Sequence, residues 1–125
     1  MKILYVATIS DTINAFLVPH IEMLVEKGNS VDVACCVRKP LNQKLTEIGC
    51  KIYNLPFSRS PLKSSNLKAA MRLRSIIRAH HYDIVHTHTP NASVCSRLAS
   101  RKSRKQGLKV IYTAHGFHFF AGAPL

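Results

Sequence analysis

Short apolar runs alternate along the chain with longer stretches in which apolar residues recur at helical spacing. Such runs are typical of buried strands, and the amphipathic stretches predict helices. Strands are expected over residues 2–8, 30–37, 50–55, 83–88 and 109–113. Helices are expected between Asp11 and Gly28 and over residues 41–48, 66–81 and 92–105. Strands that alternate with helices through short connections predict an α/β fold, a Rossmann-like open parallel sheet with helices on both faces.

Local signals refine several of these boundaries. Asp11 is a candidate N-cap of the first helix, and Pro19 predicts that this helix is kinked there or begins nearby. Gly28 and Gly49 are expected to end the first two helices. Turn-forming and basic residues make 57–65 an expected exposed loop.

The length of 125 residues fits a single domain. We find no apolar run long enough to span a membrane and no signal peptide, so a cytoplasmic location is the default expectation. The four cysteines lack the spacing of a metal site. We interpret them as small buried or half-buried residues of a protein from a reducing compartment: Cys35, Cys36, Cys50 and Cys95.

The charge is strongly unbalanced. Eighteen Lys and Arg against six Asp and Glu give a net charge of +12, concentrated in residues 59–78 and 97–109. The excess indicates an acidic partner, although solvated helix faces are an equally open interpretation. Aromatic residues do not interleave with the basic runs, so nucleic acid is an unlikely partner on this pattern.

Histidines lie at the carboxyl ends of two of the expected strands. His86 and His88 alternate with apolar neighbours and therefore share one face, and His115 follows the last strand directly. Ligands of open α/β sheets bind at the carboxyl ends of the strands, which favours a functional role for His88 and His115. Gly116 would allow a ligand to approach the backbone closely. His86 remains open between packing and function, and a packing role is favoured for three helical histidines: His20, His80 and His81.

Other chemistries have less support. A zinc site built from His86, His88, His115 and His118 would lack a cysteine or carboxylate at a fitting spacing. The sequence has no Gly-x-Ser-x-Gly elbow, no Gly-x-Gly-x-x-Gly fingerprint after the first strand and no P-loop.

Two longer motifs, Tyr82-Asp-Ile-Val-His-Thr-His-Thr-Pro90 and Val110-Ile-Tyr-Thr-Ala-His-Gly-Phe-His-Phe119, give the chain a resemblance to a known family. With the first strand and the stretch Phe16-Leu-Val-Pro19, they resemble the N-terminal domain of family-4 glycosyltransferases of the GT-B fold, particularly the bacterial capsular and exopolysaccharide group.

This resemblance implies a retaining transfer of a sugar from a nucleotide diphosphate sugar to a lipid-linked or polysaccharide acceptor. Residues 1–125 would be the Rossmann-like acceptor-side domain, with the C-terminal donor-binding domain absent and the chain inactive alone. The nucleotide sugar would be the donor substrate, and no further cofactor or metal is expected.

The resemblance also implies roles for individual residues. His115 would be catalytic, lying near the transferred sugar and assisting the transition state. The implied substrate-binding residues are Ser10, Asp11, His88, Thr89, Gly116 and His118. Many members have a glycine pair in the loop after the first strand, whereas residues 9–14 contain no glycine, which argues against close donor contact from this loop.

In the family, basic amphipathic helices dock on the anionic inner face of the cell membrane, which would suit residues 66–81 and 101–105 and a peripheral location there. Two alternatives stay open. The chain could be a non-catalytic basic module that binds an anionic membrane or nucleic acid, or a subunit whose donor domain comes from a separate chain.

Overall fold

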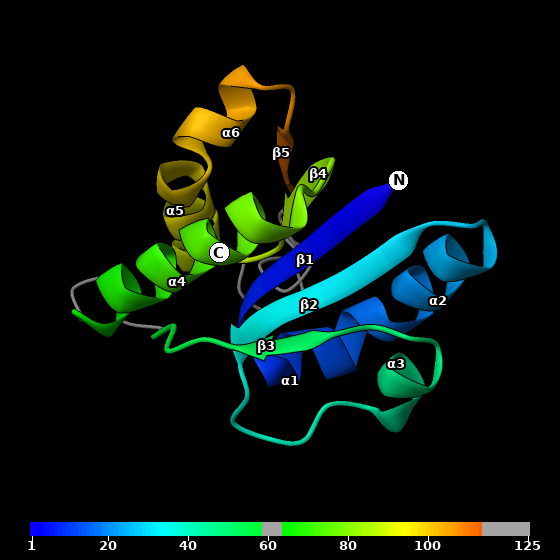
Figure 1. The fold of residues 1–125 in the computed structure, drawn as a ribbon. Helices are drawn as coiled ribbons and strands as arrows, with labels where there is room; N and C mark the ends of the chain where they lie inside the picture. Colours follow the sequence, from blue (N-terminus) through cyan, green and yellow to red (C-terminus); the bar gives the residue numbers. More distant parts are fainter. Residues whose placement is uncertain (59–63, 114–125) are drawn as a thin grey trace.

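The computed structural model describes residues 1–58 and 64–113. Its centre is a parallel sheet of five strands in the order β3-β2-β1-β4-β5 (Figure 1). The strands are β1 (Lys2–Ile9), β2 (Ser30–Cys36), β3 (Ile52–Asn54), β4 (Ile84–Thr87) and β5 (Lys109–Tyr112). Each pairs in parallel with its neighbours, so the predicted Rossmann-like fold class is confirmed.

Helices cover both faces of the sheet. They are α1 (Ser10–Thr12), the π-helical turn η1 (Ile13–Leu17), α2 (Val18–Glu26), α3 (Gln43–Glu47), α4 (Ser65–His80), α5 (Pro90–Ala99) and α6 (Arg101–Lys105). Successive side chains of a strand point to opposite faces, and β1 shows this directly. Tyr5 is buried with Leu17 and Ile21 on one face, whereas Leu4 is buried with Leu73 on the other.

The first helical stretch begins differently from the prediction. Asp11 is not its N-cap, because α1 already begins at Ser10 and its N-cap, Ile9, makes no side-chain capping bond. The side chains of Ser10 and Asp11 are instead engaged by Lys39. Pro19 lies in the first turn of α2, where the missing backbone N–H has no helical partner to lose, so the expected helix start near Pro19 is confirmed.

Two further predictions were wrong in detail. Residues 92–105 form two helices, since Ser100 departs from helical geometry (φ −96°, ψ 1°) between α5 and α6. The segment 57–65 is not exposed at its start, because Phe57 is only 4% exposed and packs in the core beneath α4. The Ser58 backbone N–H donates to Asn66 Oδ1 (2.7 Å), which ties this segment to the amino end of α4.

The cysteines have the predicted environments. All four are free, with Cys35, Cys50 and Cys95 buried and Cys36 half-buried. Burial, reinforced by the neighbouring Cys36, raises the pKa of Cys35 to about 12. Burial and the nearby Asp32 carboxylate raise the pKa of Cys50 to about 11. These thiols are therefore protonated at neutral pH and act as small apolar residues.

The buried carboxylate of Asp32 accepts two hydrogen bonds near the amino ends of the strands. The Tyr82 hydroxyl, just before β4, donates to Asp32 Oδ2 of β2 (2.5 Å), and the Lys51 backbone N–H donates to Asp32 Oδ1 (3.0 Å). Because β1 lies between β2 and β4, the bond from Tyr82 joins two segments that share no strand pairing. Burial, and then the bond to Asp32, raises the pKa of Tyr82.

Candidate functional site

The strand order reverses between the carboxyl ends of β1 and β4, the position at which open α/β sheets form a ligand crevice. From β1 the chain winds outward through β2 to β3, and it then returns to the other side of β1 to form β4 and β5. Ligands of open α/β sheets bind at such a reversal of strand order. Ser10 and Asp11 directly follow β1, and His88 and Thr89 directly follow β4, so the structure brings four of the predicted site residues to this one crevice.

Two threonines join the strands at the base of the crevice. The hydroxyl oxygens of Thr8 and Thr89 are 2.6 Å apart, and the Thr8 backbone N–H donates to Thr89 Oγ1 (3.0 Å). The His88 backbone N–H donates to the Val6 carbonyl (3.0 Å), which extends the pairing of β1 with β4. Thr89 therefore fixes the spacing of the two strand ends, a role that its position after a strand does not reveal.

We expect Thr89→Val to lower the free energy of unfolding by about 1–3 kcal/mol, because the buried Thr8 N–H would lose its acceptor. Thr89→Ser retains the hydroxyl and is the matched control. Urea unfolding of the two variants measures the difference. Equal stability of Thr89→Val and Thr89→Ser would contradict the role assigned to this hydroxyl.

His86 and His88 point to the same face of the sheet, as predicted. Their ring centroids are 4.1 Å apart, and both rings contact Tyr5, at 5.0 Å and 4.9 Å. His88 is buried at 5% exposure, whereas His86 is partly exposed. Burial raises the pKa of Tyr5 above its usual value, so its hydroxyl remains a neutral donor or acceptor.

His86 also connects β4 to the end of β5. Its Nε2 lies 2.7 Å from Thr113 Oγ1, and the Thr113 backbone N–H donates to the Thr87 carbonyl (3.0 Å). Thr113 is the last described residue of this segment, two positions before His115. Three further predicted site residues lie outside the described residues: His115, Gly116 and His118.

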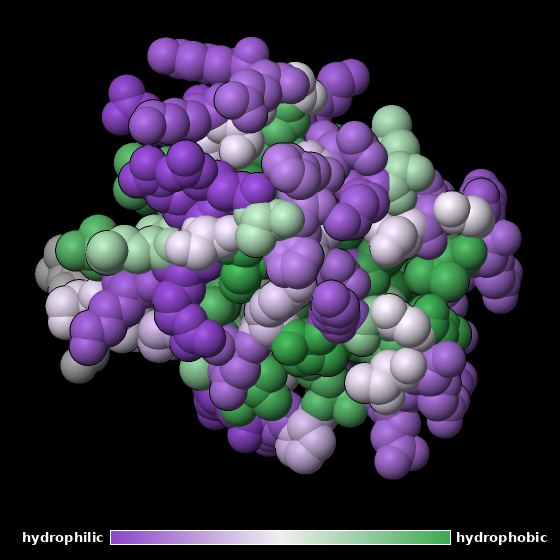
Figure 2. Space-filling view, viewed as in Figure 1, coloured by the Kyte–Doolittle hydropathy of each residue, from purple (hydrophilic) through white to green (hydrophobic). Residues whose placement is uncertain are grey.

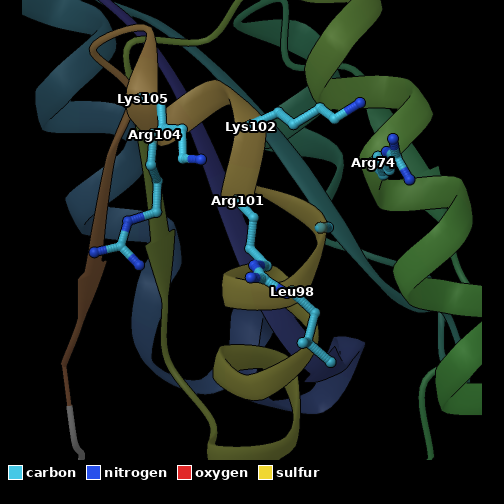
Figure 3. Close-up of a pocket in the computed structure, with 7 residues that line it drawn as sticks. Arg74, Leu98, Arg101, Lys102, Arg104 and Lys105 are labelled. Carbon is cyan, nitrogen blue, oxygen red and sulfur yellow. The ribbon is translucent and has the colours of Figure 1, made fainter.

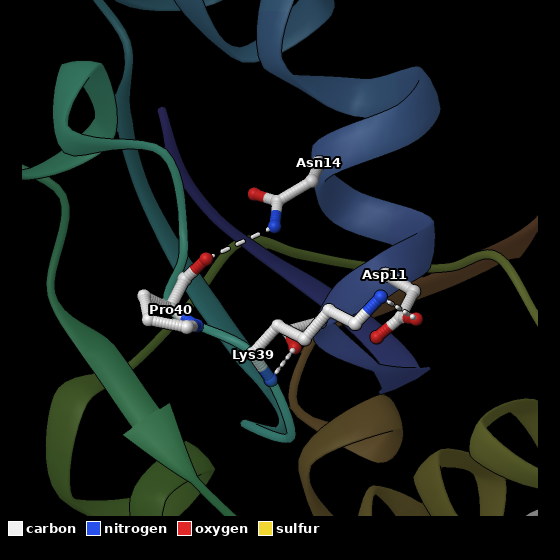
Figure 4. Close-up of polar contacts among 5 residues, drawn as sticks. Asp11, Asn14, Lys39 and Pro40 are labelled. Atoms are coloured by element: carbon white, nitrogen blue, oxygen red, sulfur yellow. Dashed lines mark hydrogen bonds and ion pairs between the residues drawn. The ribbon is translucent and has the colours of Figure 1, made fainter.

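The loop after β2 packs against the residues that follow β1. Ser10, which is fully buried, accepts a hydrogen bond at Oγ from the Lys39 backbone N–H (3.0 Å). Asp11 Oδ2 lies 3.8 Å from Lys39 Nζ, and the Asn14 amide donates to the Pro40 carbonyl (3.1 Å) (Figure 4). The Ser10 hydroxyl is thus engaged by this loop. Asn14 and Lys39 were not predicted, because nothing in the local sequence indicates contacts between segments 26–29 residues apart.

Asp11 retains one acceptor that the described residues leave unused. Its Oδ1 is shielded from solvent and has no hydrogen-bond partner in the described part of the chain. A carboxylate oxygen accepts hydrogen bonds from hydroxyl groups, and imidazoles can donate or accept them. Strand ends that bear Asp11 and His88 are therefore chemically suited to a polyhydroxylated or phosphorylated ligand.

We also searched the described residues for a metal site and for a membrane-spanning helix. Among residues 1–58 and 64–113, we find no group of three or more His, Cys, Asp or Glu side chains that could hold a metal ion. The same residues contain no helix that is long and apolar enough to span a membrane.

Together, the strand order and the parallel pairing define a Rossmann-like domain, the fold of one half of a GT-B structure. The resemblance to solved structures supports this class: MurG of Acinetobacter baumannii superimposes with a TM-score of 0.63 at 18% identity, over 90% of this chain and 33% of MurG. The chain belongs to the glycosyl transferase 4-like family, whose model matches residues 2–125.

Two curated relatives share this part of the sequence. The Bacillus subtilis (strain 168) protein named "Putative glycosyltransferase EpsD" is 41% identical over 124 residues, which is 99% of this chain. The Escherichia coli UDP-Gal:alpha-D-GlcNAc-diphosphoundecaprenol alpha-1,3-galactosyltransferase is 26% identical over 99 residues, or 78% of this chain. This chain spans 31% of the length of the first relative and 25% of the second.

Proposed function

We propose that this chain is the acceptor-binding N-terminal part of a retaining glycosyltransferase. The enzyme would transfer a sugar from a nucleotide diphosphate sugar to a lipid-linked or polysaccharide acceptor. The observation that carries the proposal is the convergence of Asp11, His88 and Thr89 at the strand reversal of a glycosyl transferase 4-like domain. The galactosyltransferase relative, whose name specifies UDP-Gal and a diphosphoundecaprenol acceptor, supports the substrate classes.

In this proposal the crevice holds the acceptor, and a second domain brings the donor to it. Asp11 Oδ1 would accept a hydrogen bond from a sugar hydroxyl, because it is shielded from water and unengaged within the described residues. His88 would line the crevice, and His115, with Gly116 and His118 beside it, would face the transferred sugar from the end of β5. Assembly of a transition state requires both substrates in one geometry, so residues 1–125 alone would be inactive.

The proposed location is the cytoplasmic side of the cell membrane, where a nucleotide sugar would meet a lipid-linked acceptor. The net charge of +12 supports peripheral attraction to an anionic membrane surface. The same charge favours the second candidate, a non-catalytic basic binding module.

The test is a transfer assay with the full-length natural protein, after its intact mass has been measured. Radiolabelled nucleotide diphosphate sugars and a diphosphoundecaprenol-linked acceptor are the probes. We expect transfer with retention of the anomeric configuration, read by NMR of the product, and no transfer by residues 1–125 alone. An inverted product would refute the retaining mechanism. Absence of transfer across the donor panel would favour the basic module.

A further inference from the structure

Three consecutive helices on one face of the sheet bear an unbalanced positive charge. Helices α4, α5 and α6 contain nine Lys and Arg residues and no Asp or Glu. Their side chains are all exposed, and in the described part of the chain none forms an ion pair with a carboxylate. The nine are Lys68, Arg72, Arg74, Arg78, Arg97, Arg101, Lys102, Arg104 and Lys105. Figure 2 shows hydrophilic side chains gathered over α6 at the top of the view.

A groove between α4 and the α5–α6 pair concentrates part of this charge. It has a volume of about 740 Å³, and its cationic lining consists of Arg74, Arg101, Lys102, Arg104 and Lys105. Lys102 extends from α6 toward α4, which bears Arg74 (Figure 3). Lys102 also lines an adjoining cavity of about 470 Å³ with Tyr82 and Asp83, which precede β4. This adjoining cavity lies at the amino edge of the sheet, opposite to the candidate glycosyltransferase crevice.

An apolar surface continues the groove along both helices. Leu67 and Met71, one turn apart on α4, are 65% and 64% exposed, and Val94 and Leu98 on α5 are 60% and 57% exposed. These large apolar side chains lie on neighbouring helices, because Cys95 Sγ donates to the Asn66 carbonyl (3.6 Å). We refer to Leu67, Met71, Val94 and Leu98 as the apolar patch.

The order of apolar and basic side chains along α4 is the same as the order along α5 and α6. On α4 the apolar pair is followed by Arg74 and Arg78, at spacings of three and four residues. On α5 and α6 the apolar pair is followed by Arg101 and Lys105, at the same spacings. Since both Arg74 and Leu98 line the groove, the two series lie side by side. Along α4 the series spans about 16 Å.

This surface fits a partner that is apolar at one end and anionic at the other. A second copy of this surface is unsuitable, since two surfaces that each bear nine Lys and Arg and no Asp or Glu repel each other. The described parts of the three helices contain no Trp, Tyr or Phe, the side chains that typically anchor proteins at a membrane interface. A groove between two helices also suits a polypeptide segment better than the flat surface of a bilayer.

We propose that the groove and the apolar patch dock an acidic amphipathic helix of a partner protein. In helix-in-groove recognition, the bound helix presents apolar side chains at spacings of three and four residues. Such side chains would lie along one face of the partner helix and could pack on the apolar patch. The partner's Leu or Met side chains would pack on Leu67, Met71 and Leu98, and its Glu or Asp side chains would pair with Arg74 and Lys102. This inference goes beyond the proposed sugar transfer and does not depend on it.

The test measures binding of a synthetic helical peptide to the full-length protein by fluorescence anisotropy. The peptide has about 18 residues, or five helical turns, with leucines along one face of its first half and glutamates along the same face of its second half. We expect Arg74→Glu with Lys102→Glu to weaken binding at least about tenfold, because both variants place like charges opposite the glutamates. The matched control is Lys27→Glu with Lys44→Glu, which makes the same change in net charge at exposed positions near α2 and α3.

Two further comparisons test the apolar patch and the competing partner. Met71→Gln with Leu98→Gln should also weaken binding, and a peptide with Gln in place of Leu should bind less tightly than the original. Equal binding of the two peptides, or equal losses in the groove and control variants, would overturn the proposal. Binding of phosphatidylglycerol vesicles that depends on Arg74 and Lys102, without binding of the peptide, would assign the surface to the membrane instead.

Discussion

His115→Ala in the full-length protein is expected to lower kcat for sugar transfer about 10²- to 10³-fold, the usual effect of removing a group that stabilises developing charge. The reason is the role proposed for His115, which follows β5 by three positions in the sequence and would face the transferred sugar. A group that acts mainly in the transition state affects kcat far more than KM. We therefore expect a nearly unchanged KM for the donor, measured by initial rates over a range of nucleotide sugar concentrations.

The control for this variant is His20→Ala, which removes an exposed histidine from α2. It should leave kcat and the melting temperature unchanged. The melting temperature of His115→Ala should also match that of the natural protein, so that a loss of rate reports chemistry rather than unfolding. Unchanged turnover of His115→Ala would remove the catalytic assignment while leaving the fold and family intact.

Tyr82→Phe is expected to lower the free energy of unfolding by about 2–3 kcal/mol at neutral pH. The Asp32 carboxylate, which is 7% exposed, would lose the Tyr82 hydroxyl as a donor and would retain the Lys51 backbone N–H. Hydrogen bonds to charged groups are worth more than neutral ones, and a buried acceptor without its partner is costly. Equilibrium urea unfolding of the two proteins measures the difference.

The pH dependence of this effect follows from the raised pKa of Tyr82. Above about pH 10, the usual pKa of a tyrosine, the unfolded chain loses the phenol proton while the folded protein retains it. The folded state therefore loses stability relative to the unfolded state as pH rises. We expect the stability difference between the natural protein and Tyr82→Phe to shrink above about pH 10. Tyr112→Phe, which removes the hydroxyl of an exposed tyrosine on β5, is a matched control, and a difference that grows with pH would contradict the assignment.

Much of the fold could be predicted because its elements follow from local pattern. Apolar runs gave β1 and β2 to within one residue at their ends, and the periodic stretch 66–81 matches α4 closely. Prediction failed where a distant contact overrides local preference. Asp11 is engaged by Lys39 rather than capping a helix, and Phe57 is buried beneath a helix that begins eight residues later.

The candidate site, like the fold, could be predicted only in part from the sequence. The sequence placed His88 at the end of a strand and Thr89 directly after it, and that position alone indicated the carboxyl edge of a sheet. It did not indicate that the Thr89 hydroxyl would bond to Thr8, or that His86 would reach Thr113, since these partners are 81 and 27 residues away. Similarly, the basic residues were evident, but their assembly around one groove depends on how α4 packs beside α5 and α6.

The sequence by itself determined the alternation of strands and helices, the identity of the polar strand ends and the net positive charge, because each of these is a property of neighbouring residues. Only the tertiary structure decided the strand order β3-β2-β1-β4-β5, and with it the crevice between β1 and β4. Local periodicity specifies which face of a strand is buried, but not which strand lies beside it. That choice depends on the packing of helices on the two faces of the sheet, and it brings Thr8, near the end of β1, into contact with Thr89, which follows β4.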